Sequence, residues 1–250
     1  MMRSIIGSEI YKIIKQKFFL YLISGATVLA IITIGLNQML VGSHPQIMNT
    51  GSNILVSSLS NISVSTILCA IFIHFHIGKE FTNRTITSMI ESGFSRRDIY
   101  LSKVIICICF CAVLILVYPI VSSIGTTCLN GWGKDVSIID IVRDVLIFLF
   151  NNFFILAFCI LLDFIVESKT ISLIINMLVV GVGSEIFIGL STELPVLEKI
   201  LNYMPIGKIN LIGGTMARKT DYVAALVSSV IWSGVILLIG YYRFRKLDIK

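Results

Sequence analysis

Charged residues are scarce in this chain, and that scarcity excludes an ordinary soluble domain. Only 14% of the 250 residues are charged and 56% are hydrophobic, whereas soluble domains carry about 25% charged residues. The charges gather in patches between apolar runs of about 20 residues, the length that a helix needs to cross about 30 Å of hydrocarbon. The sequence therefore predicts an all-α, polytopic membrane protein. Little is left for a soluble part, so we expect residues 1–250 to form a single transmembrane domain.

Sequence motifs for catalysis and nucleotide binding are missing as well. No GxxxxGK(S/T) loop occurs, so the chain should not bind ATP by that route. There is no paired-histidine zinc motif, no GxSxG and no pair of aspartates across the spans, which argues against an intramembrane protease. We expect no catalytic residue, no metal site and no cofactor bound by this chain.

Paired cysteines are also absent. None of the six cysteines forms a CxxC motif, the spacing of many zinc and redox sites, and five fall within predicted spans, where free cysteine behaves as a small hydrophobe. The six are Cys69, Cys107, Cys109, Cys111, Cys128 and Cys159. His74 and His76 lie two residues apart, about 200° around a helix. They cannot both bind one metal ion from the same helix face.

Six apolar runs are long enough to span a membrane. The predicted spans are 18–41, 54–77, 102–124, 145–166, 171–190 and 222–242. The first half of the second span is rich in serine and asparagine, so we expect that face to meet other helices or water.

Residues 3–16 precede these spans and carry too much charge to cross a membrane. Isoleucines at helical spacing predict an amphipathic helix that lies in the interface with its polar face toward the cytoplasm. The apolar face would hold Ile6, Ile10, Ile13 and Ile14, and the polar face Ser8, Glu9, Lys12 and Lys15. The alternative is a basic leader that only sets orientation.

The basic residues predict the orientation. With both termini inside, 14 of the 20 Lys and Arg residues fall in cytoplasmic segments, as the positive-inside rule requires. The net charge of +6 sits at membrane boundaries, where orientation and anionic lipid explain it. It therefore gives no reason to expect a nucleic acid partner.

Few ionisable groups fall inside the predicted spans. Glu185 lies in the outer half of the fifth span; it could line a path for a cationic or amphipathic substrate, or pair with a basic residue of the outer segment. Asp163 is expected at the inner interface or paired with Lys169. Residues 191–221 form a long outer segment that we expect to hold short helices; whether it re-enters the membrane is left open.

The longest charged interruption in the first half of the chain is 79–103, predicted to be a cytoplasmic loop. Residues 85–91 form a short amphipathic helix there, Gly93 ends it, and Ser95 with Asp98 caps the next helix. The apolar face would comprise Ile86, Met89 and Ile90, with Phe94 just beyond. An apolar face exposed on this side predicts a partner protein; the alternative is the bilayer surface.

This loop and the order of elements resemble the permeases of the ABC type-2 exporter family, especially small permeases of peptide export and immunity that handle bacitracin, lantibiotics or phenol-soluble modulins. The matching letters are Glu80-Phe-x-Asn83-x-Thr85, then Ser95-Arg96, then Tyr100-Leu-Ser-Lys103. Two positions depart from the family pattern: Arg84 stands where Gly often precedes the Thr, and Gly93 stands where Pro often precedes the Ser-Arg pair. These departures concern the subfamily.

The resemblance implies one half of a dimeric pore in the bacterial plasma membrane. Its partners would be a second permease copy, membrane lipid, and a separate ATPase subunit that holds ATP and Mg. The loop helix would be the coupling helix that docks on the ATPase, and ATP-driven closure would expel amphipathic or antimicrobial compounds. The implied docking residues are Glu80, Arg84, Thr85, Ile86, Met89, Ile90, Glu91, Phe94, Arg96 and Arg97.

Three other functions compete with this interpretation. Two halves of three spans each fit a stand-alone secondary transporter built from inverted repeats, but only Glu185 offers a well-placed buried acid. A non-transporting membrane immunity protein would need no ATPase. An intramembrane enzyme would need catalytic motifs, which are missing.

Overall fold

The computed structural model describes most of the chain. The described residues are 2–43, 50–60, 63–133, 136–166, 169–183 and 219–247, and parts of the stretch between, namely 186, 189–190, 194, 196, 199, 201 and 203–212. They form helices, turns and short connections, with no β-strand among them. This part of the structure confirms the all-α prediction.

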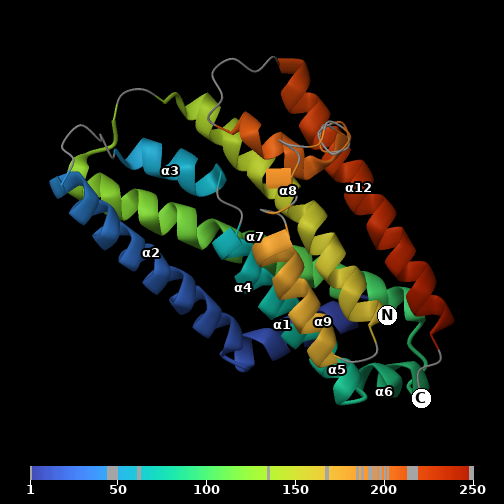
Figure 1. Ribbon diagram of the computed structural model, residues 1–250. Helices are drawn as coiled ribbons and strands as arrows, with labels where there is room; N and C mark the ends of the chain where they lie inside the picture. Colours follow the sequence, from blue (N-terminus) through green and yellow to red (C-terminus); the bar gives the residue numbers. More distant parts are fainter. Residues whose placement is uncertain are drawn as a thin grey trace.

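The helices follow the chain in an order that matches the apolar runs. They are α1 (Met2–Lys15), α2 (Phe18–Ser43), α3 (Gly51–Ser60), α4 (Ser63–Ile73), the π-helix η1 (His74–Gly78), α5 (Lys79–Thr82), α6 (Thr85–Glu91), α7 (Arg96–Asn130), α8 (Ile138–Ile165), α9 (Lys169–Leu178), the π-helix η2 (Val179–Gly183), the 3₁₀ helix η3 (Pro205–Leu211) and α12 (Lys219–Lys246). Figure 1 shows α5 and α6 at one end of the bundle with the end of α12, and α3 at the opposite end.

Among the described residues, four helices are long and apolar enough to cross a membrane: α2, α7, α8 and α12. They contain or closely match four of the six predicted spans. The predicted span 54–77 is broken instead, because α3 and the helix that follows it differ in direction by 49°. The predicted span 171–190 begins with the short apolar helix 170–181, and part of its outer half lies outside the described residues.

The start of α3 packs partly inside the protein, although Ser57 and Ser60 in the serine-rich half of the second span are exposed. Ser52 and Ser58 on α3 are buried, and Ser123 on α7 donates a hydrogen bond to the carbonyl of Gly51 at 2.9 Å. A Cβ atom at Gly51 would clash with the Thr127 hydroxyl. The missing side chain thus lets the start of α3 lie directly on α7.

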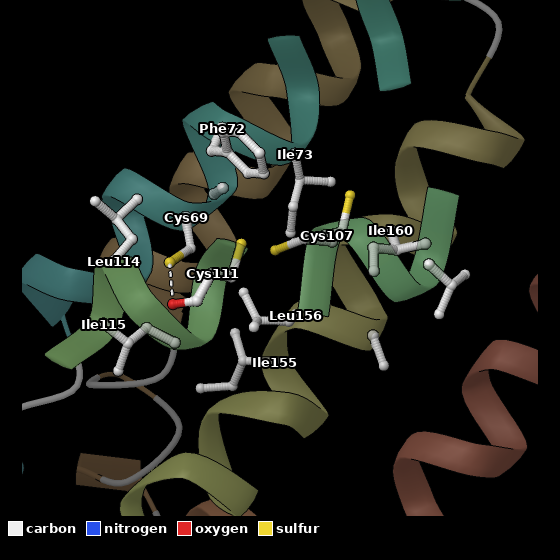
Figure 2. Close-up of a cluster of buried hydrophobic side chains, with 14 of the residues drawn as sticks. Cys69, Phe72, Ile73, Cys107, Cys111, Leu114, Ile115, Ile155, Leu156 and Ile160 are labelled. Atoms are coloured by element: carbon white, nitrogen blue, oxygen red, sulfur yellow. Dashed lines mark hydrogen bonds between the residues drawn. The ribbon is translucent and has the colours of Figure 1, made fainter. Parts of the chain in front are cut away.

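The hydrophobic core is built from α4, α7 and α8. Figure 2 shows aliphatic side chains of these helices around Cys69, Cys107 and Cys111. These three thiols and Cys159 are free and buried, whereas Cys109 and Cys128 are free and exposed. The Cys69 thiol donates weakly to the Cys111 carbonyl at 3.7 Å. Burial among apolar side chains confirms that the four buried cysteines act as small hydrophobes.

The amphipathic helix α1 forms as predicted, but it buries a different face. Ile5, Glu9 and Ile13 are buried, while Ile10 and Ile14 are exposed. The prediction that Glu9 lies on an outward polar face is therefore wrong. Glu9 faces inward because a buried lysine meets it there, and the exposed isoleucines leave an apolar edge suited to a membrane interface.

Candidate functional site

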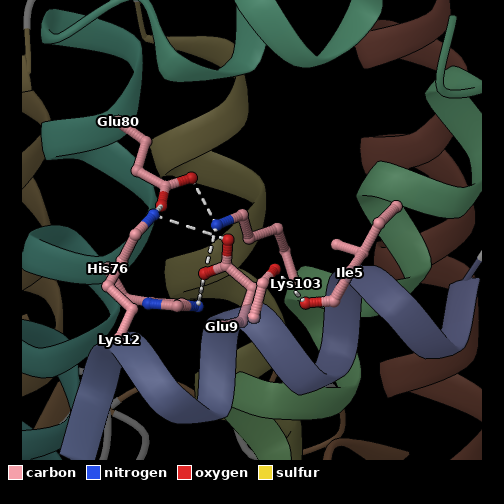
Figure 3. Close-up of polar contacts among 7 residues, drawn as sticks. Ile5, Glu9, Lys12, His76, Glu80 and Lys103 are labelled. Carbon is pink, nitrogen blue, oxygen red and sulfur yellow. Dashed lines mark hydrogen bonds and ion pairs between the residues drawn. The ribbon is translucent and has the colours of Figure 1, made fainter. Parts of the chain in front are cut away.

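Five ionisable side chains from three parts of the chain meet at the α5–α6 end of the bundle. We call this set the charge cluster; it comprises Glu9, Lys12, His76, Glu80 and Lys103. Figure 3 shows them converging from α1, from the end of α4 through α5, and from α7. Two acids face two lysines, so the formal charges balance when His76 is neutral.

Lys103 is the centre of the charge cluster. Its ammonium group lies 2.7 Å from Glu9 and also forms an ion pair with Glu80. Lys103 and Glu9 are both fully buried, and Glu80 is only 6% exposed. A buried charge is costly unless it is paired, so the ion pairs with Glu9 and Glu80 offset the cost of burying Lys103.

Lys12 closes the charge cluster on its outer side. Its ammonium group lies 2.5 Å from Glu80 and 3.5 Å from Glu9, and His76 Nε2 lies 3.5 Å from Glu9. Partial burial lowers the pKa of Lys12, but the hydrogen bond and charge of Glu80, with those of Glu9, outweigh it and raise that pKa above the usual 10.5. A raised lysine pKa means that its stabilisation is complete below pH 10.5 and is lost as the pH rises through the folded value.

The loop that follows Glu80 is held in shape by backbone features. Arg84 adopts a left-handed conformation (φ 54°) and precedes α6. At the other end, Gly93 has φ 87°, the Gly93 amide donates to Ile90 and the Phe94 amide donates to Met89, which is a Schellman ending. The Ser95 hydroxyl accepts from the Asp98 amide at 3.0 Å. The structure thus confirms the predicted helix stop and the predicted cap.

The apolar face of α6 lies against the protein itself. Ile86 is fully buried, and Met89, Ile90 and Phe94 are half-buried against the core. The premise that this whole face is exposed is therefore wrong, because α6 folds back under the bundle. It leaves the exposed Arg84, the exposed Glu91 and the partly exposed edges of Met89 and Phe94 toward solvent.

The four remaining residues that the resemblance implies for docking lie in four different environments. Thr85 is half-buried, Arg97 is exposed, and Glu80 belongs to the charge cluster. Arg96 is half-buried and donates to the carbonyls of Phe244, Arg245 and Leu247 at 3.2, 2.9 and 2.7 Å. Arg96 therefore caps the end of α12 and ties the loop to the last helix.

A comparison with known families decides what kind of protein carries this loop. The family model described as ABC-2 family transporter protein matches residues 5–183. The chain belongs to the ABC-2 transporter family. The matched region includes the whole charge cluster, the loop and α6. The search of curated proteins found no match.

Membership makes the chain an ABC-2 permease, a membrane-spanning subunit. Within the permease, a second polar group lies behind the charge cluster, around Asp163. The fully buried Asp163 carboxylate accepts from Ser172 at 2.5 Å and from Asn176 at 3.4 Å, and it contacts His74 Nδ1 at 3.1 Å. Asp163 is therefore buried and joins α8, η1 and α9, so the prediction that it is interfacial is wrong. The alternative pairing with Lys169 falls on a side chain outside the described part of the chain.

The two histidines of the permease face different partners. His74 contacts Asp163 and His76 contacts Glu9, which confirms that the pair does not share one helix face. Among the described residues, no group of three His, Cys, Asp or Glu side chains could hold a metal ion. Glu185 and parts of the segment 191–221 lie outside the described residues.

Sequence reasoning missed Glu9, Lys103 and His76 as members of one site. The available signal was Lys103 itself, which lies inside the predicted third span, where an ionisable residue implies a buried partner. The partner could not be named from the sequence, because Glu9 lies 94 positions earlier.

Proposed function

We propose that the chain is the membrane-spanning subunit of an ATP-driven exporter and that it works as one of two permease copies beside a separate ATPase subunit. Six spans with both termini in the cytoplasm then place α5 and α6 on the cytoplasmic side. The observation that carries this proposal is the charge cluster, which joins the loop to α1 and to α7.

The charge cluster gives the loop a mechanical connection to the membrane. Glu80 precedes α6 by five residues and pairs with Lys103 at the start of α7, a helix of 35 residues. Glu80 also pairs with Lys12 on α1. A displacement of α6 by the ATPase would therefore move α7 and α1 together, because separating these ions inside the protein is costly.

The surface offered to the ATPase is the outward side of the loop. It consists of the charged Arg84 and Glu91 and the partly exposed edges of Met89 and Phe94. Charges at the edge of an interface guide partners and set register, while the apolar edges supply contact area. Arg97 lies on the same side of the membrane.

The substrate class that we propose is an amphipathic compound such as a peptide. An apolar cavity of about 270 Å³ lies between α8, η2 and the residues that precede and begin η3, and Phe154, Val180 and Met204 are among its lining residues. Such a cavity suits the apolar part of an amphipathic compound. Glu185 follows η2 by two residues and stays a candidate for a polar or cationic part.

The docking test compares charge reversals on the loop with one elsewhere on the same side. The permease is purified with its ATPase, and complex formation and ATP hydrolysis are measured for Glu91→Lys, Arg84→Glu and the control Lys246→Glu. We expect the two loop variants to weaken complex formation at least tenfold and the control to behave as the parent. Equal binding by all three would contradict docking at this loop, and a parent protein that binds no ATPase would overturn the proposed function.

A further inference from the structure

Two adjoining cavities lie along α12 where it passes α7 and α8. One, of about 500 Å³, is lined by Arg97, Tyr100 and neighbouring residues of α7 and by α12 from Gly234 to Tyr241. The other, of about 240 Å³, lies between α8 and α12 and reaches Ile108. Gly234 and Leu237 line both. The two cavities therefore adjoin along α12, and we call them together the α12 groove.

The length of the α12 groove matches one leaflet of a bilayer. Gly234 lies twelve residues before the end of α12 at Lys246, about 18 Å along a helix. Arg97 and Ile108 lie eleven residues apart on α7, about 16 Å. Half of a bilayer core about 30 Å thick is about 15 Å. The groove thus begins at the α5–α6 end and ends near the middle of the membrane.

The hydroxyl groups of Ser229, Ser233 and Tyr100 in the wall of the α12 groove are already engaged within the protein. The hydroxyls of Ser229 and Ser233 donate to carbonyls of their own helix at 2.8 and 2.6 Å, and Tyr100 donates to the Leu237 carbonyl at 2.7 Å. At Gly234, a Cβ atom would meet nothing within 4 Å. The interior is therefore apolar and open at Gly234, which suits a hydrocarbon chain.

The mouth of the α12 groove carries a cation. Arg97 is exposed, lines the larger cavity and has no ion pair or side-chain hydrogen bond within the described part of the chain. The preceding residue, Arg96, by contrast donates its hydrogen bonds to backbone carbonyls at the end of α12. The exposed charges in the last turn of α12 are also basic: Arg243, Arg245 and Lys246. An apolar hollow with a basic mouth complements a molecule with an acidic head and an apolar tail.

We propose that the α12 groove binds one acidic phospholipid of the cytoplasmic leaflet. An acyl chain lies along Leu237 and Gly234, and the phosphate meets the Arg97 guanidinium. Basic sites between spanning helices on the cytoplasmic side bind acidic lipid headgroups in this way. This site binds a lipid of the surrounding membrane. Its test is therefore independent of the proposals on ATPase docking and on the transported compound.

The test measures lipid retained by the purified full chain in native mass spectrometry, with phosphatidylglycerol or phosphatidylcholine added. The parent protein should retain one phosphatidylglycerol in preference to phosphatidylcholine. Arg97→Gln should lower phosphatidylglycerol retention about fivefold, the effect of one basic residue at an acidic membrane surface. Retention of phosphatidylcholine should not change, and neither should that of either lipid in the control Arg84→Gln.

A second pair of variants tests the groove itself. Gly234→Leu should abolish retention of both lipids by filling the hollow, while Gly35→Leu on α2, whose added side chain also meets open space, should retain them as the parent does. Equal retention of the two lipids by the parent, or full retention by Gly234→Leu, overturns the proposal. A Gly234→Leu variant that separates permease dimers but keeps its lipid also overturns it, because the groove would then hold a second copy.

Discussion

Lys103 sets the balance of charge inside the α5–α6 end of the molecule. It is fully buried and pairs with both Glu9 and Glu80. Because a buried ion depends on its partner, loss of this lysine leaves two carboxylates with one lysine, the partly exposed Lys12, and with His76 beside Glu9. The effect of substituting Lys103 on the free energy of unfolding should thus depend strongly on whether Glu9 and Glu80 keep their charges.

A double-mutant cycle tests this dependence. Lys103→Met should lower the free energy of unfolding by about 3–5 kcal/mol, because it orphans buried carboxylates. Adding Glu9→Met should restore much of that loss. Thermal unfolding in detergent measures the stability of the single and the double variant. The control is Lys15→Met, which replaces an exposed lysine on α1, the helix that carries Glu9. Additive losses in the double variant would show that the two residues do not depend on each other.

Lys12 gives the same site a defined response to alkali. Its raised pKa means that the contribution of Lys12 stays constant from neutral pH to about pH 10 and falls only above the usual lysine value. The stability difference between the parent and Lys12→Met should therefore be flat up to about pH 10 and shrink above it. A difference that shrinks already between pH 7 and 9 would contradict the pairing.

At the scale of elements, α6 owes its position to its two ends. The φ of 87° at Gly93 is unfavourable for residues with a side chain by about 1–2 kcal/mol. Gly93→Ala should therefore increase hydrogen exchange of the α6 amides several-fold. Gly7→Ala, in a helix where the added Cβ meets nothing, should leave α6 unchanged. Unchanged exchange in both variants would show that α6 is held by packing alone.

The left-handed Arg84 offers a second test at the same element. A β-branched side chain is strongly disfavoured at φ 54°, so Arg84→Ile should destabilise the loop by about 1–3 kcal/mol. Arg84→Gly should keep the loop folded, since glycine adopts this conformation freely. Limited proteolysis of the loop distinguishes the two variants, and equal cleavage would contradict the role of the turn.

These elements also show how far the sequence alone reaches. The spacing of Ile86, Met89 and Ile90 predicts α6, Gly93 predicts its C-terminal end, and Ser95 predicts the start of α7, because local backbone rules decide them. The direction in which α6 folds is not local. It depends on which apolar surface lies nearest, and the sequence could not tell the bundle from a partner. The burial of Glu9 is hidden for the same reason, since only the packing of α1 on α7 brings Lys103 beside it.

At the scale of the whole molecule, six spans were predicted from hydrophobic length alone, and four of them are long apolar helices in the described part of the chain. The bend between α3 and the helix after it was not predicted, because length says nothing about direction. The family match over 5–183 covers the loop and the charge cluster, but it does not give the number of spans.

The proposed orientation can be tested with native cysteines. Cys128, exposed near the far end of α7, and Tyr11→Cys, exposed on α1, should react with a membrane-impermeant maleimide from opposite sides of intact cells. Cys128 should be labelled from outside and Tyr11→Cys only after lysis, in a Cys109→Ala background. Labelling of both from the same side would contradict six spans with both termini inside.

The central claim is that the charge cluster transmits the motion of the loop to α1 and α7. The most direct measurement is ATP-driven transport by the permease–ATPase complex in vesicles for the double variant Glu80→Gln with Lys12→Gln. This variant removes one charge of each sign, so the buried site stays neutral while the link from loop to helices is lost. We expect it to fold and to bind the ATPase as the parent does, but to transport at least tenfold more slowly, within the usual range of coupling between sites. Transport at the parental rate by the folded, ATPase-bound double variant would contradict the claim.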